Sequence, residues 1–137
     1  MFPNAITFPN LTRTAQEAAD QIGCPVGAIC KSIIFRAGDG VVLVLTSGSN
    51  KVDTKKVEAL LGTPLEKADA DFVKEKSGFV IGGVAPWGHK TVPTVFIDVS
   101  LAQFSEIWAS AGTANSVFPT TYAQLIEKTG AQEVAVA

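Results

Sequence analysis

Residues 77–89, SGFVIGGVAPWGH, form the stretch of this sequence with the most residues that could take part in binding or catalysis. They hold four glycines, a proline, an indole and the only histidine of the chain, and the apolar run 79–81 before Gly82 is expected to be the end of a strand. Because glycine loses much conformational freedom on folding, the pair Gly82 and Gly83 indicates unusual dihedral angles or a close approach by another group. The backbone N–H groups of residues 82–86 could bind an anion or an oxyanion. A wide turn between two strands is the alternative interpretation.

Lys31 is the second candidate. It lies among Ile29, Cys30 and the apolar residues 33–35, at the start of a predicted core strand. Lysine is almost never fully buried without a partner, so its side chain either extends along apolar surface to water or holds an ammonium in a pocket. The sequence leaves both arrangements open, and the first is the commoner one.

Two further polar features follow predicted strands. The loop TSGSN, residues 46–50, comes directly after a buried strand, which makes Ser47, Gly48 and Asn50 candidates for ligand contact. Asp98 ends a later strand. If these groups meet Lys31 and the glycine pair, they form a pocket with a fixed positive charge and backbone donors, suited to orienting a small ester and polarising its carbonyl.

The sequence lacks the motifs of other common catalytic and metal-binding sites. The sequence has no Gly-x-Ser-x-Gly elbow and no Walker-type phosphate loop, and one histidine with scattered carboxylates gives no metal-ligand cluster. The two cysteines, Cys24 and Cys30, form neither a disulfide framework nor a zinc site, and they fit a reducing compartment.

Capping residues and periodicity predict the elements that position these groups. The predicted pattern is irregular α+β, without the regular period of a doubly wound sheet. We expect helices from the N-cap Thr14 to Gly23, over 53–61 (Val57, Leu60 and Leu61 inward), over 69–76, from Ser100 through Phe104, Ile107 and Trp108, and over 121–128, and strands over 5–8, 29–36, 41–45, 94–97 and 133–136.

The composition bounds the class of protein. With 137 residues, of which 47% are hydrophobic and 18% charged, we expect a single domain over residues 1–137. A net charge of −2 argues against broad nonspecific coating of nucleic acid, although a local basic patch such as Lys51, Lys55 and Lys56 is compatible with it. No apolar run is long enough to span a bilayer, so we expect a cytoplasmic protein without membrane contact.

Several motifs together carry a family resemblance. TAQEAADQIG, ICKSIIFR, LTSGSNKVD, SGFVIGGVAPWGH, FIDVSL and WASAGTANSVF occur in this order between about Thr14 and Glu133. In order and spacing they resemble the YbaK-like family, related to the editing domain inserted in bacterial prolyl-tRNA synthetase. The resemblance implies a mixed, partly barrel-like sheet with surrounding helices. It also implies a free-standing deacylase that hydrolyses mischarged tRNA, most often tRNA for proline carrying a small non-cognate amino acid, without a cofactor or metal.

The resemblance also implies roles for residues. Lys31, in the I-x-K-S motif, would hold the 3′-terminal adenosine and steer the aminoacyl ester. The Gly-x-x-x-Pro loop would hold the ester and the attacking water through its backbone, with Gly82 and Gly83 catalytic and with Val84 and Pro86 binding substrate.

The remaining implied contacts lie further along the chain. Asp98 matches an acidic residue at a strand end, Asn115 and Ser116 lie in the loop that closes the pocket, and His89 fits the Gly-His ending of a subgroup. The partners would be mischarged tRNA and possibly a synthetase. Two alternatives stay open: a module that binds an RNA 3′ end or a synthetase without hydrolysis, and a Schiff-base role for Lys31.

Overall fold

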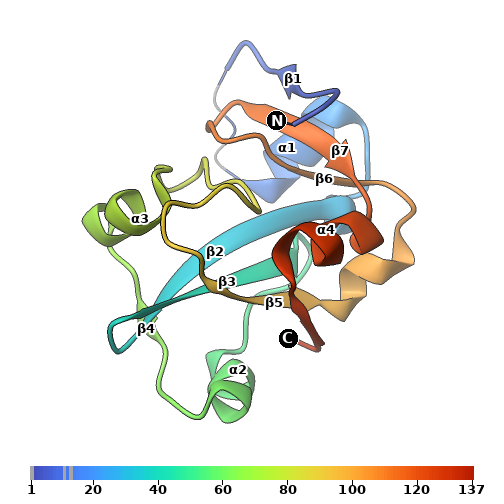
Figure 1. Ribbon diagram of the computed structural model, residues 1–137. Coiled ribbons are helices and arrows are strands. Elements are labelled where there is room, and N and C mark those ends of the chain that lie inside the picture. The colour runs from blue at the N-terminus through green and yellow to red at the C-terminus, as the bar shows by residue number, and fades with distance from the viewer. Residues whose placement is uncertain (1, 11, 13) are drawn as a thin grey trace.

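The fold is α+β, and the described residues build one mixed sheet of eight strands (Figure 1). The computed structural model describes residues 2–10, 12 and 14–137. The strand order is β1-β7-β6-β2-β3-β5-β8, with β4 pairing β2 outside this path. The strands are β1 (Ile6–Thr7), β2 (Ile29–Ala37), β3 (Gly40–Ser47), β4 (Glu66–Lys67), β5 (Thr94–Asp98), β6 (Ile107–Ser110), β7 (Ser116–Thr120) and β8 (Gln132–Val134). The helices are α1 (Ala15–Ile22), α2 (Thr54–Leu61), α3 (Ala70–Ser77) and α4 (Tyr122–Thr129), with 3₁₀ turns η1 (Val26–Ala28) and η2 (Val99–Gln103).

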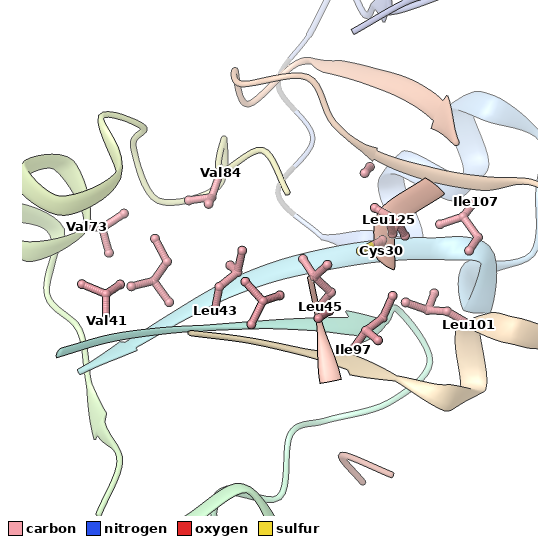
Figure 2. Close-up of a cluster of buried hydrophobic side chains, with 14 of the residues drawn as sticks. Cys30, Val41, Leu43, Leu45, Val73, Val84, Ile97, Leu101, Ile107 and Leu125 are labelled. Carbon is pink, nitrogen blue, oxygen red and sulfur yellow. The ribbon is translucent and has the colours of Figure 1, made fainter. Parts of the chain in front are cut away.

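The antiparallel hairpin of β2 and β3 forms the centre of the sheet. Every residue of β3 after Gly40 is buried, because both faces of the strand are covered. On one face Leu43 and Leu45 pack with Val73 of α3 and with Val84, as Figure 2 shows. On the other face Val42 and Val44 pack with α2 and β8. The predicted hairpin and its fully buried second strand are therefore confirmed.

One edge of β2 is paired only at its two ends. β6 runs parallel to it at Ile29 and Cys30, and β4 runs antiparallel to it at Phe35 and Arg36. Between them, residues 31–34 have no strand partner on this edge among the residues that the structure describes. We call this segment the open edge of β2.

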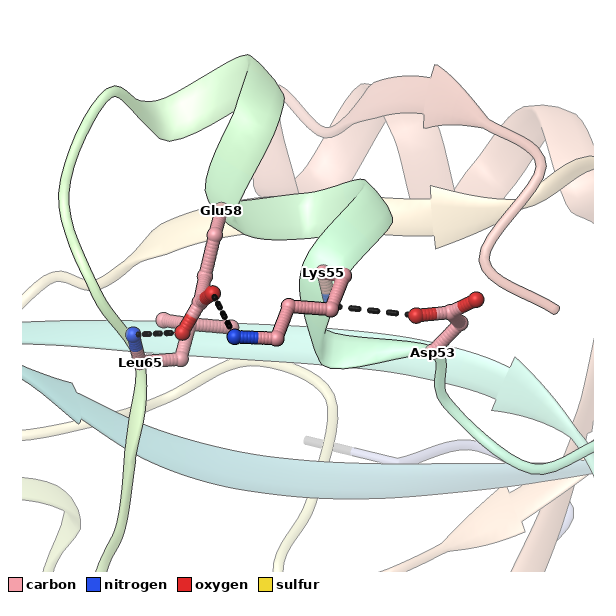
Figure 3. Close-up of polar contacts among 4 residues, drawn as sticks. All are labelled: Asp53, Lys55, Glu58 and Leu65. Atoms are coloured by element: carbon pink, nitrogen blue, oxygen red, sulfur yellow. Dashed lines mark hydrogen bonds and ion pairs between the residues drawn. The ribbon is translucent and has the colours of Figure 1, made fainter.

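Each helix is bounded by local capping chemistry. Thr14, Asp53, Asp69 and Thr121 accept hydrogen bonds from first-turn amides, and left-handed glycines end all four helices. These helices confirm four of the five predicted. Figure 3 shows how α2 is tied down: the Asp53 carboxylate accepts from the Lys55 N–H (3.0 Å), and Glu58 accepts from the Leu65 N–H (2.7 Å).

The fifth predicted helix is wrong. Asp98, rather than Ser100, caps the short turn η2, and residues 107–110 form strand β6. Ile107 and Ala109 are buried while Trp108 and Ser110 are half-buried, which is the period of two that a strand requires. Pairing with β7 on one side and β2 on the other makes this segment a strand.

Two smaller expectations also fail. Leu60, predicted to face inward, is 53% exposed on α2. The apolar run 79–81 before the glycine pair is not a strand, and its Val80 and Ile81 are exposed. The glycine pair therefore lies within an irregular loop rather than at the end of a strand. We call residues 79–89 the glycine loop.

Candidate active site

A cavity of about 980 Å³ lies along the open edge of β2. Its walls come from residues 29–35 of β2, from residues around α1, from β4, from the glycine loop and from the segment before β7. Five of the sequence-predicted site residues line it: Lys31, Gly48, Gly82, Val84 and Ser116. The others lie behind these walls, where they support them.

The Lys31 ammonium is held in place. Its Nζ donates to the backbone carbonyl of Asn50 at 2.8 Å, and the side chain is half-buried. Burial lowers the pKa of Lys31, while the negative charge of Asp98 opposes that shift. The structure shows the Lys31 ammonium held by a backbone carbonyl, and Lys31 is one of the residues that line the cavity.

Asp98 organises the loop that holds this ammonium. The residue is 1% exposed, and its Oδ2 accepts from the Asn50 Nδ2 (2.9 Å), the Ser47 N–H (3.0 Å) and the Thr46 hydroxyl (3.1 Å). Oδ1 accepts from the Ser100 N–H at 2.9 Å. Burial opposes ionisation, but these hydrogen bonds outweigh it and hold the pKa of Asp98 below its usual range. Asp98 thus lies behind the cavity wall as an anion that fixes residues 46–50.

Ser47 and Asn115 are also supports. The Ser47 hydroxyl donates to the Gly27 carbonyl at 2.7 Å and is fully buried. Asn115 binds the N-terminal segment: its Nδ2 donates to the Phe8 carbonyl (3.1 Å), and its own carbonyl accepts from the Phe8 N–H (2.7 Å). Ser116 lines the cavity, and its hydroxyl bonds that of Thr113 at 2.5 Å.

The glycine loop contributes residues with unpaired backbone amides to the cavity lining. The Gly83 N–H donates to the Val80 carbonyl at 2.9 Å, so a turn within the loop already uses it. The Gly82 and Val84 amides have no hydrogen-bond acceptor in the part of the chain that the structure describes, and both residues line the cavity. The amide of Ile81, which also lines the cavity, is likewise without an acceptor among the described residues, so these three amides, rather than that of Gly83, are the available donors.

Gly83 is needed for packing instead. A Cβ atom there would lie 2.9 Å from the Ala114 nitrogen and from the Thr113 carbonyl carbon, so only glycine lets the two loops touch. Gly82 has φ = 89°, in the region that favours glycine, and open space around its Cα. The two glycines of the pair therefore have different functions.

Pro86, Trp87 and His89 close the back of the loop. Pro86 is buried, and Trp87 packs edge-on against Phe118 at 5.2 Å. The His89 Nε2 bonds the Ala85 carbonyl at 2.7 Å and must be the donor, since a carbonyl only accepts. Burial lowers the pKa of His89, so the ring is neutral at pH 7 and holds the loop rather than the cavity wall.

The sequence interpretation missed one lining residue with unusual properties. Ser32 follows Lys31 in β2, and its hydroxyl is buried with no hydrogen-bond partner among the described residues. Cys30 also lines the cavity, but burial raises its pKa to about 12, so its thiol is protonated and is no nucleophile at neutral pH. Within the described residues, no group of three His, Cys, Asp or Glu side chains could hold a metal ion, and no helix has the length and apolarity to cross a membrane.

Comparison with known proteins identifies the family. The model of the aminoacyl-tRNA editing domain matches residues 10–128. The chain belongs to the aminoacyl-tRNA editing domain family. This editing domain is 36% identical over 121 residues to the uncharacterized protein YwhH of Bacillus subtilis, a match that covers 88% of this chain and 77% of YwhH.

Two further relatives connect the editing domain with proline. It is 34% identical over 88 residues to the proline–tRNA ligase of Thermosipho africanus, covering 64% of this chain but only 16% of the ligase. A crystal structure of a candidate trans-editing enzyme for prolyl tRNA synthetase superposes with a TM-score of 0.91 at 42% identity, covering 95% of this chain and 83% of the other. The family and the fold predicted from the sequence are confirmed.

Proposed function

We propose that this protein hydrolyses the aminoacyl ester of mischarged tRNA in trans. Water adds to the ester carbonyl, the bond to the 3′-terminal ribose oxygen breaks, and the products are a free amino acid and uncharged tRNA. The observation that carries this proposal is one cavity with a held ammonium, Lys31, and two backbone amides without acceptors, at Gly82 and Val84.

Each group has a role in this reaction. Lys31 anchors the 3′-terminal aminoacyl-adenosine, and the free amides of Gly82 and Val84 bind the oxyanion that develops when water attacks. Loss of one such donor typically reduces the rate by about a hundredfold or more. Asp98 and Asn50 act through Lys31, and His89 acts through the loop.

The substrate itself supplies the group that activates the water. The titratable side chains among the described lining residues are Lys31, Lys67 and Cys30. None of them is a carboxylate or a histidine, and burial keeps the Cys30 thiol protonated, so the described lining offers no general base of the usual kind. A ribose hydroxyl or the side chain of the amino acid would assist the water, and the domain would supply position and electrostatics.

The proposed substrate is tRNA for proline carrying a small non-cognate amino acid. The similarity to proline–tRNA ligases and to a candidate trans-editing enzyme supports this choice. Action in trans would place the protein in the cytoplasm and make a synthetase a possible partner. The overall charge of −2 fits recognition of a tRNA end at the cavity, where Lys31 and Lys67 lie, rather than along a basic surface.

A panel of purified aminoacyl-tRNAs tests the proposal by release of free amino acid. We expect wild type to deacylate a small aminoacyl-tRNA, Lys31→Ala to lose this activity, and the exposed Lys55→Ala to keep it. The proposal is wrong if Lys31→Ala deacylates at the wild-type rate. Lys55 is the matched control because it is 88% exposed on α2 and lies outside the cavity.

The second candidate is a module that binds charged tRNA without turnover. The lack of a general base among the described lining residues favours it. Multiple turnovers separate the two, since a pure binding module would protect the ester from spontaneous hydrolysis instead of accelerating its loss.

A further inference from the structure

Ser32 lies in the middle of the open edge of β2, where the cavity runs. Successive residues of a strand turn their N–H and C=O groups to alternate edges. The Ile29 carbonyl faces β3, since it accepts from the Gly48 N–H at 2.7 Å. Residues 31 and 33 therefore also face β3, and Ser32 turns its backbone N–H and C=O to the open edge, where no described strand is in register with it.

The Ser32 side chain adds a third unpaired group. Its hydroxyl oxygen is buried and has no hydrogen-bond partner among the described residues. Buried hydroxyl groups are normally paired, so an unpaired one beside a cavity points to a partner supplied from outside. A serine hydroxyl moves from one staggered position to another by rotation about the Cα–Cβ bond alone. The Ser32 hydroxyl can therefore turn toward a ligand without a change in the backbone.

Lys31 and Ser32 point to opposite faces of the sheet. By alternation, Ser32 shares a face with Cys30 and Ile34, which pack in the same cluster as Val84 of the glycine loop. Figure 2 shows Cys30 and Val84 on this side of the sheet. An ester that contacts both Lys31 and the glycine loop must therefore cross the open edge, directly over the Ser32 backbone.

We propose that Ser32 binds the α-ammonium group of the aminoacyl ester, with its backbone carbonyl and its hydroxyl oxygen as acceptors. This inference rests on the proposed deacylase function, which places the ester at this edge. The α-nitrogen lies two bonds from the ester carbonyl carbon, and an ammonium carries three donors that need acceptors. The neighbours Cys30, Val84 and Ala109 line the cavity and have small side chains, so they leave room for this end of the substrate.

The test compares substrates with and without the ammonium. The small aminoacyl-tRNA that wild type hydrolyses fastest and its N-acetyl derivative are given to wild type, Ser32→Val and Ser32→Thr. Valine and threonine have the same shape, so the two variants differ only in the hydroxyl. Because a hydrogen bond to a charged group is a strong one, we expect Ser32→Val to deacylate the free-amine substrate about tenfold or more slowly, to change the N-acetyl rate little, and Ser32→Thr to restore the wild-type preference.

Three results overturn the proposal: Ser32→Val slowing both substrates equally, Ser32→Val slowing neither, or both variants slowing the free-amine substrate alike. A tRNA ending in hypoxanthine, which changes the donor and acceptor edge of the terminal base, gives a further arm. If Ser32→Val no longer distinguishes the two terminal bases but still distinguishes the free-amine substrate from its N-acetyl derivative, the open edge binds adenine instead.

A binding measurement separates this inference from the proposed function. A 3′-aminoacylamino-3′-deoxyadenosine has an amide that resists hydrolysis and keeps the ammonium. If wild type binds it more tightly than its N-acetyl form, and Ser32→Val does not, the ammonium site stands even where no ester is hydrolysed. If wild type hydrolyses the ester but binds the two forms of the analogue equally well, the deacylase function is supported and the Ser32 ammonium site is wrong.

Discussion

Lys31 is connected to Asp98 through a single residue, Asn50. The Asn50 carbonyl accepts from the Lys31 Nζ at 2.8 Å, and its side-chain amide donates to the Asp98 Oδ2 at 2.9 Å. The amide also donates to the Ser100 hydroxyl at 3.1 Å. A buried anion thus fixes both the position and the surroundings of a cavity-lining cation without lying in the cavity.

Asn50→Ala should slow deacylation by about tenfold with little change in the fold, because the carbonyl that holds Lys31 stays but its anchor to Asp98 is lost. Single-turnover rates measure the loss, and circular dichroism checks the fold. The control is Gln132→Ala, which removes an exposed amide on β8. Equal rates for Asn50→Ala and wild type would show that the anchor has no part in positioning Lys31.

Asp98→Asn should destabilise the protein at neutral pH by about 2–4 kcal/mol, since several buried donors lose a charged acceptor. The folded-state pKa of Asp98 lies below the unfolded value, so the carboxylate contributes stability at neutral pH that is lost as the pH falls through the folded pKa. Urea unfolding between pH 7 and pH 3 should therefore show the gap between wild type and variant closing below about pH 4. A gap that is constant across this range would contradict the assignment.

The alkaline side of the pH–rate profile should report Lys31. Because burial lowers the pKa of Lys31, the rate should fall at a pH below the ordinary value for lysine, about 10.4. The Asp98 charge raises this pKa, so Asp98→Asn should move the fall to lower pH, and the nearby Lys51→Ala should move it to higher pH. The spontaneous alkaline hydrolysis of the ester is subtracted at each pH. Movement in the same direction for both variants would be inconsistent with this electrostatic origin.

Gly83→Ala and Gly82→Ala should both lower the stability of the fold, but for different reasons. At Gly83 the added Cβ meets the backbone of Thr113 and Ala114, and such overpacking costs about 1–3 kcal/mol and displaces the glycine loop. At Gly82 the space is open, and the cost is that of a left-handed alanine, about 1–2 kcal/mol. Thermal unfolding should show both losses. The deacylation rate of the folded protein should fall more for Gly83→Ala, and a rate equal to wild type would disprove the role of this contact.

Local signals allowed much of the fold to be predicted. N-caps followed by helical periodicity and a left-handed glycine identify four helices, and the apolar run of β3 identifies the central strand. The predicted helix from Ser100 through Trp108 is wrong because Phe104, Ile107 and Trp108 contain too few repeats to separate a period of two from one of 3.6, and pairing with β7 and β2 makes residues 107–110 a strand.

The candidate site was predictable in its residue types but not in its roles. Lys31 and Gly82 carry visible signals, an ammonium in an apolar strand and a glycine pair. That Asp98 lies behind the cavity wall and that Gly83 serves packing depend on contacts with residues 46–50 and 113–114, which sequence spacing does not encode. The unpaired groups of Ser32 depend on where β6 stops and β4 begins.

The open edge of β2 also bears on how this protein avoids unwanted association. Unpaired strand edges invite another chain to add as a further strand, and natural proteins keep such edges short or covered. Here the unpaired segment is residues 31–34, bounded by β6 and β4 and lined above by the glycine loop. An added strand usually needs about five or six residues to pair, so a polypeptide would collide with β6 or β4 before gaining a full ladder. The gap is therefore too short for an added strand of the usual length.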